Sequence, residues 1–169
     1  MYIASRKIKL NLICSLTRRS SRDLPVGRPL SLALAFKLDI RRMKIFRYKR
    51  EHENAVISAI EKDPNWDIFT NDRAIGNYRK RLLESITYVC YCNGTFGGYL
   101  RALLDDGFAT YISELFVVPE LRNRTIGRTL IAKVKMDFRH LTVYALSDED
   151  AYYEKLGYRK VGSVFEIHE

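Results

Sequence analysis

A basic, glycine-containing segment carries the clearest chemistry in this 169-residue chain. Between Glu114 and Leu130, a β-branched run is followed by Arg122, Arg124 and Arg128, with Gly127 among them. A strand that passes through such a turn into a helix brings unpaired backbone N–H groups and the positive helix end to one spot. The pattern therefore predicts an anion site suited to a pyrophosphate, although exposed basic residues without a ligand fit it equally well.

Two single side chains could transfer protons, but the residues alone leave their roles open. Glu114 lies on a predicted strand whose orientation is not fixed, so a solvated or salt-bridged carboxylate is an alternative to a catalytic one. Tyr153, like its neighbours Tyr152 and Tyr158, would by itself be interpreted as an aromatic packed under the last strand. The three histidines are scattered, and none is assigned a ligand or catalytic role.

Cysteine usage excludes two classes of protein. The chain has three cysteines, Cys14, Cys90 and Cys92, too few for a disulfide framework. There is no Cys/His cluster with zinc-ligand spacing, so no metal is expected. A reducing, cytoplasmic compartment is the natural interpretation. The length and the 47% hydrophobic content indicate one packed domain.

The net charge of +9 is concentrated at the N-terminus. Residues 1–42 hold ten Lys or Arg and two Asp or Glu, whereas residues 43–169 are almost balanced. This basic, Ser-rich extension, which we expect to be disordered, is either an organellar targeting peptide or a segment upstream of a true start at Met43. A nucleic-acid-binding arm is a weaker alternative, and secretion a minor one. No stretch is apolar and long enough to span a membrane.

The remaining residues alternate between strand and helix patterns, and they predict an antiparallel meander followed by a strand–helix–strand crossover. Asn93-Gly94 is the dipeptide best suited to a tight hairpin. Asp72 is a candidate helix cap, and Gly157 a left-handed helix end. The predicted strands are 44–49, 86–92, 96–103, 108–118, 141–145 and 161–167. The predicted helices are 51–62, 72–83, 126–140 and 147–156.

This order of elements, together with three motifs, resembles the GNAT superfamily of acyl-CoA-dependent N-acyltransferases. The motifs are Leu115-Phe-Val-Val-Pro119, Arg122-xx-Thr-Ile-Gly-Arg128 and Ala151-Tyr-Tyr-Glu-Lys-Leu-Gly-Tyr158. The resemblance covers residues 43–169 and leaves the first 42 unexplained. It implies an α/β (α+β) fold with a mixed, mostly antiparallel central sheet and helices on both faces. It also implies acetyl transfer from acetyl-CoA to a primary amine of a small molecule or polypeptide.

The resemblance places the co-substrate along one strand end and the turn after it. Backbone groups of Leu115, Phe116 and Val117 would pair with the pantetheine arm. Arg122 occupies the position where the family has Arg or Gln. The amides that would hold the CoA pyrophosphate belong to Asn123, Arg124, Thr125, Ile126, Gly127 and Arg128.

The resemblance also assigns the two proton-transfer roles. Tyr153 matches the tyrosine that, in many relatives, protonates the departing thiolate. Glu114 corresponds to a carboxylate that takes a proton from the amine, directly or through water. Each such transfer is typically worth about 10²- to 10⁴-fold in rate. Trp66, Phe69 and Tyr78 fall in the region that covers the acceptor cleft in the family, and they could equally belong to the core.

One departure from the family pattern bears on cofactor affinity. Thr125 stands where the family usually has the first glycine, and a β-branched residue resists a positive φ. Weak cofactor binding is therefore expected unless the Thr125 hydroxyl caps the helix and faces a phosphate. The asparagine that often precedes the tyrosine helix is also missing, so one cofactor contact is expected to be lost.

Three functions follow as alternatives. The first is an N-acetyltransferase with an amine acceptor, and a homodimer is one assembly that it could form. The second is a catalytically silent CoA-binding regulatory domain. The third is a nucleic-acid-binding protein that acts through the basic arm. It ranks last because Lys and Arg in the arm alternate with apolar residues and Tyr2 and Phe36 are its only aromatic residues.

Overall fold

The computed structural model describes residues 43–167, and the predicted targeting or upstream segment 1–42 lies outside them. Five strands form one sheet in the order β1-β2-β3-β4-β5. Neighbours from β1 to β4 are antiparallel, and β4 pairs with β5 in parallel. The strands are β1 (Met43–Arg47), β2 (Ile86–Cys92), β3 (Thr95–Asp105), β4 (Ala109–Val117) and β5 (Thr142–Ala145).

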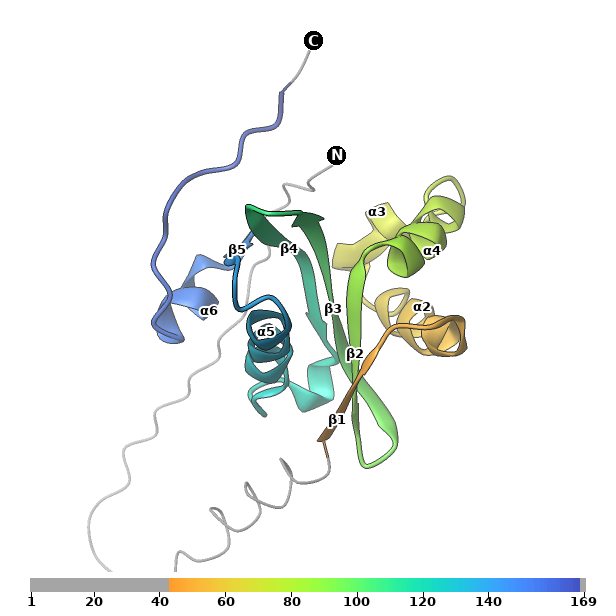
Figure 1. Ribbon diagram of the computed structural model, residues 1–169. Coiled ribbons are helices and arrows are strands. Elements are labelled where there is room, and N and C mark those ends of the chain that lie inside the picture. Colours follow the sequence, from red (N-terminus) through yellow and green to blue (C-terminus); the bar gives the residue numbers. More distant parts are fainter. Residues whose placement is uncertain (1–42, 168–169) are drawn as a thin grey trace, which may run out of the picture.

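Helices cover both faces of this sheet, as Figure 1 shows, so the predicted mixed α/β fold is confirmed. The α-helices are α2 (Glu53–Ile60), α3 (Asp67–Thr70), α4 (Ile75–Glu84), α5 (Ile126–Asp137) and α6 (Asp150–Lys155). Short 3-10 turns are η1 (Arg50–His52), η2 (Pro64–Trp66) and η3 (Pro119–Leu121). None of the helices described is long and apolar enough to cross a membrane.

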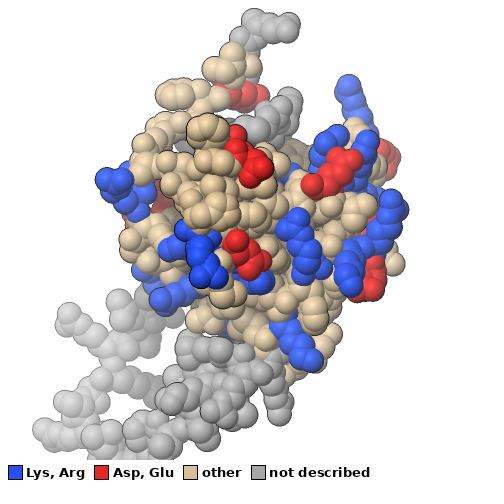
Figure 2. Space-filling model, in the orientation of Figure 1, with Lys and Arg blue, Asp and Glu red and all other residues tan. Residues whose placement is uncertain are grey.

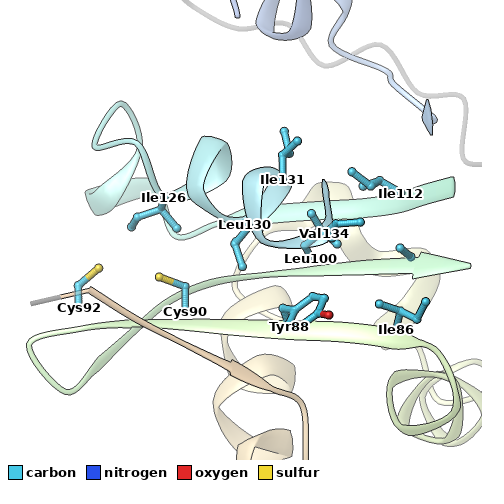
Figure 3. Close-up of a cluster of buried hydrophobic side chains, with 11 residues drawn as sticks. Ile86, Tyr88, Cys90, Cys92, Leu100, Ile112, Ile126, Leu130, Ile131 and Val134 are labelled. Carbon is cyan, nitrogen blue, oxygen red and sulfur yellow. The ribbon is translucent and has the colours of Figure 1, made fainter. Parts of the chain in front are cut away.

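Two buried clusters hold the layers together. On one face, α5 packs Leu130 and Val134 onto the sheet, where Cys90 and Leu100 are fully buried (Figure 3). On the other face, α2 and α4 pack against the sheet around Tyr99. Both clusters require the i, i+3, i+4 spacing of apolar residues in the helices and the alternation in the strands.

Turn residues behave as the sequence predicts at the β2–β3 hairpin and after α6. Asn93 and Gly94 have φ of 54° and 82°, as a tight hairpin turn needs, and Gly157 has φ of 81°. The predicted Asp72 cap is wrong. Helix α4 begins at Ile75, and the side chain of Asn71 accepts the hydrogen bond from the backbone N–H of Ala74.

The predicted last strand over 161–167 is wrong. These residues form no strand, and Figure 1 shows the chain after α6 running away from the sheet. The large apolar side chains Val161, Val164, Phe165 and Ile167 are 52–88% exposed. An alternating pattern makes a strand only when it finds a neighbouring strand to pair with, and this segment finds none among the described residues.

Candidate active site

The site begins where β4 and β5 separate. Their parallel pairing ends at Ile112 and Ala145, and the N–H of Leu146 then donates to the carbonyl of Ile112 at 2.9 Å. Beyond this point the Leu115–Val117 stretch of β4 pairs with β3 only, among the described residues. Its other edge therefore faces a gap in the sheet, at the place where the pantetheine arm is expected.

A bulge in β4 changes which way its side chains face. Arg101 of β3 is opposite Glu114, and the next residue, Ala102, is opposite Ile112, so Ser113 is the extra residue. Ile112 consequently packs toward α5, while Glu114 faces α4. Without the bulge, residues 112 and 114 would share one face of the sheet.

The basic turn joins the end of β4 to α5. Asn123 and Thr125 both have positive φ, 63° and 67°, so Thr125 does adopt the left-handed conformation that its branched side chain disfavours. Its hydroxyl donates to the carbonyl of Arg124 at 2.5 Å and makes no cap bond to α5. The Thr125 hydroxyl therefore does not occupy the first-turn N–H groups of α5, which must be open for an anion to bind there.

Arg122 is held in place by two contacts at the start of this turn. Its Nε donates to the carbonyl of Val117 at 3.1 Å, and its Nη2 lies 3.1 Å from Asp63 Oδ2. Asp63 follows α2, so this ion pair joins the basic turn to the segment between α2 and α3. A pocket of about 510 Å³ opens beside the pair.

Tyr153 and Tyr152 lie next to each other on α6, with ring planes at 86°. Burial raises the pKa of Tyr153 well above its usual value, and the nearby hydroxyls of Tyr152 and Tyr158 add to the shift. A tyrosine that remains protonated at neutral pH can serve as a proton donor but not as a base. Both side chains pack at the edge of the α5 cluster, so they are on the opposite side of the sheet from Glu114.

Glu114 is the centre of a buried hydrogen-bond network. Its Oε1 accepts from Arg101 Nε at 2.7 Å and also from Arg101 Nη2, while its Oε2 accepts from the Tyr78 hydroxyl at 2.6 Å. The Tyr99 hydroxyl lies 3.3 Å from the same Oε2. Only 4% of the Glu114 side chain is exposed, so an amine cannot reach the carboxylate in this conformation.

The charges of Arg101 and Glu114 balance each other in this network. Burial works against the guanidinium charge, but the hydrogen bonds and the charge of Glu114 outweigh it and raise the pKa of Arg101. Burial and then the neighbouring Glu114 charge raise the pKa of Tyr78 far above its usual value. The four side chains therefore form one ion pair with two neutral hydroxyls.

The comparisons with known proteins bear on this arrangement. The family model described as an acetyltransferase (GNAT) domain matches residues 61–168. The chain belongs to the GNAT family. No curated protein matches the chain.

Solved GNAT structures share the fold at low sequence identity. The aminoglycoside acetyltransferase AAC(6')-Iy, in complex with a bisubstrate analogue, has a TM-score of 0.62 at 15% identity, over 75% of this chain and 97% of its own. An aminoglycoside acetyltransferase from an uncultured soil metagenomic sample has a TM-score of 0.59 at 24% identity, over 75% and 98%. A GNAT-family protein from Streptococcus pneumoniae has a TM-score of 0.58 at 16% identity, over 75% and 99%.

Several residues of this GNAT site could not be found from the sequence. Arg101 and Tyr99 are ordinary strand positions, and only the register of β3 and the bulge at Ser113 bring them to Glu114. Of the three aromatic residues near the expected acceptor cleft, Tyr78 is buried in the core at 5% exposure. Trp66 and Phe69 pack at the edge of the same cluster.

Proposed function

We propose that this GNAT protein transfers an acetyl group from acetyl-CoA to a primary amine by direct attack of the amine on the thioester. One observation carries the proposal. Beyond Ile112 the edge of β4 that faces β5 is unpaired, the basic turn follows the end of β4, and Tyr153 and Glu114 lie on opposite sides of the sheet. This arrangement supports a thioester placed between a proton donor and a carboxylate.

In this proposal the co-substrate is held mainly by backbone groups. Leu115, Phe116 and Val117 would pair through their free strand edge with the amides of the pantetheine arm. The N–H groups from Asn123 to Arg128, with Arg124 and Arg128 nearby, would hold the pyrophosphate. Arg122 would act through its charge, shared between the phosphate and Asp63.

Tyr153 and Glu114 would differ in how directly they reach the reacting atoms. Tyr153 would protonate the departing thiolate; its raised pKa keeps the hydroxyl protonated at neutral pH, but it also makes the hydroxyl a weaker acid. Glu114 would accept the amine proton indirectly, through water or a hydroxyl, because its two oxygens are already bonded to Arg101 and Tyr78. The carboxylate would also favour a cationic amine electrostatically, although Arg101 offsets much of this attraction.

An amine acceptor is supported by the structural neighbours. The neighbour AAC(6')-Iy was solved with a CoA derivative of acetylneamine, and another aminoglycoside acetyltransferase was solved with sisomicin. The acceptor proposed for this chain is the broader class, a primary amine of a small molecule or polypeptide. Among the described residues, the buried cysteines Cys90 and Cys92 form no disulfide, which is compatible with a reducing cytoplasm, the compartment that we propose.

A silent CoA-binding domain is the second candidate, and Thr125 is the observation that favours it. The residue has φ of 67° and gives no cap to α5, so it supplies neither the freedom of glycine nor a hydroxyl for the phosphate. The nucleic-acid alternative has less support from residues 43–167, because Lys and Arg are interspersed with Asp and Glu on the face seen in Figure 2.

Release of free CoA thiol from acetyl-CoA tests the proposal. The full chain would be incubated with acetyl-CoA and a panel of primary amines, with the matching tertiary amines as controls. Amine-dependent thiol release, together with the acetylated primary amine identified by mass spectrometry, supports the transferase. Cofactor binding without turnover of any amine would favour the silent domain.

A further inference from the structure

Tyr152, the residue beside the proposed proton donor, reaches the basic turn. A Cβ built on Gly127 would collide with the Tyr152 hydroxyl oxygen, and it would lie 3.5 Å from Leu115 Cδ2. Gly127 is in the first turn of α5, and Leu115 is on the part of β4 that leaves β5. The Tyr152 ring therefore fills the space between the end of β4 and the start of α5.

The close approach leaves no room for a side chain at position 127 unless Tyr152 shifts. This residue is helical and its φ is ordinary, so the glycine provides space rather than conformational freedom. Phenylalanine at position 152 would fill the same volume without bringing a polar atom to this place. A hydroxyl that lies against a helix N-terminus is thus a feature that packing alone does not explain.

The Tyr152 hydroxyl has no hydrogen-bond partner among residues 43–167. Its ring is half-buried, and its pKa is raised by burial and then by Tyr158, so the hydroxyl keeps its proton at neutral pH. Buried polar groups in native proteins are generally hydrogen-bonded. The hydroxyl oxygen can accept from a first-turn N–H of α5, but those amides are donors only and cannot take its proton, which is therefore available to an anion bound at the same turn.

We infer that the Tyr152 hydroxyl donates a hydrogen bond to the pyrophosphate of bound acetyl-CoA, beside the amides of the basic turn. This inference rests on the proposed function, and it gives the two neighbouring tyrosines different roles. Tyr152 binds the co-substrate, whereas Tyr153, whose ring is turned by 86°, acts on the thiolate. A hydrogen bond to a charged acceptor corresponds to about tenfold or more in the dissociation constant.

Paired Tyr→Phe variants of the full chain test the inference by calorimetric titration. With CoA as the ligand, Tyr152→Phe should weaken binding by about tenfold or more. With S-acetylpantetheine, which lacks the pyrophosphate, Tyr152→Phe and the wild type should bind equally. Tyr158→Phe removes a hydroxyl from the same neighbourhood and should leave both affinities unchanged.

Stability separates a binding role from a structural one. Because the hydroxyl has no partner among the described residues, Tyr152→Phe should unfold without ligand at the same temperature as the wild type or higher. Equal CoA affinity for Tyr152→Phe and the wild type, or an equal loss with S-acetylpantetheine, would overturn the inference. If the wild type itself did not bind CoA, the proposed function would fail instead.

Discussion

Removing one member of the buried ion pair between Arg101 and Glu114 should lower the stability of the protein strongly. Removing the guanidinium in Arg101→Met would leave the Glu114 carboxylate at 4% side-chain exposure with hydroxyl donors only. The Arg101 side chain is itself only 12% exposed, so solvent screens the pair little. Breaking a buried pair from one side typically costs about 3–5 kcal/mol. For a protein of this size, that corresponds to a fall of roughly 6–20 °C in the thermal unfolding midpoint.

Removing both charges should be far less harmful. In Arg101→Met with Glu114→Leu, the buried ion pair is gone. The Tyr78 and Tyr99 hydroxyls lose their acceptor, and the part-buried Ser85 hydroxyl loses the Arg101 donor. An unsatisfied buried hydroxyl costs about 1–3 kcal/mol, and the two tyrosine hydroxyls can still bond to each other. The double variant should therefore be more stable than Arg101→Met alone, which is the signature of a coupled pair.

Urea unfolding followed by circular dichroism measures these differences. Arg79→Met is the matched control, because Arg79 pairs with Glu53 at 3.3 Å with side chains 45% and 22% exposed. Such a pair is worth about 0–1 kcal/mol. If Arg101→Met lost no more stability than Arg79→Met, or if the double variant were the less stable one, the buried-pair reasoning would be refuted.

Three further perturbations test other parts of the molecule. Tyr153→Phe should reduce turnover by about 10²-fold or more and leave the dissociation constant of acetyl-CoA unchanged; equal turnover with chemistry rate-limiting would contradict its role as the acid. Thr125→Gly removes a left-handed strain of about 1–2 kcal/mol but gives the unfolded chain more freedom, so titration should show tighter cofactor binding with stability changed by less than about 1 kcal/mol. A weaker cofactor affinity would show that the threonine side chain contributes to the site. Burial, and then a hydrogen bond to Asp137, raises the pKa of Tyr88 from 10.0 to about 12, so its stabilising effect is complete below pH 10 and is lost as pH rises through 12. Urea midpoints between pH 9 and 12 should therefore fall less steeply for Tyr88→Phe than for the wild type, and parallel curves would show that Tyr88 is not responsible.

Most of the fold could be predicted because it depends on local patterns. The β-branched and aromatic run of β2, the Asn93-Gly94 turn and the apolar stripe of α5 each predict the element that forms. The 161–167 segment alternates as a strand would, yet it forms none. Strand formation depends on a partner edge, and that information is not contained in the segment itself.

The basic turn of the site could be predicted from the sequence, but the hydrogen-bond network around Glu114 could not. The turn from Arg122 to Arg128 is continuous in sequence, so its basic residues and glycine are visible together. The partners of Glu114 come from β3 and α4, and they meet it only because Ser113 bulges out of register. The position of the Tyr152 hydroxyl over Gly127 depends likewise on how α6 packs against α5.

Thermal unfolding of the full chain with and without acetyl-CoA is the most direct test of the central claim, with adenosine diphosphate as the control for generic phosphate binding. A ligand at 100 times its dissociation constant stabilises the native state by about 2.7 kcal/mol, which corresponds to a rise in the midpoint of several degrees. We predict a rise with acetyl-CoA that clearly exceeds the rise with adenosine diphosphate. An unchanged midpoint at millimolar acetyl-CoA would contradict the claim that this GNAT domain uses acetyl-CoA.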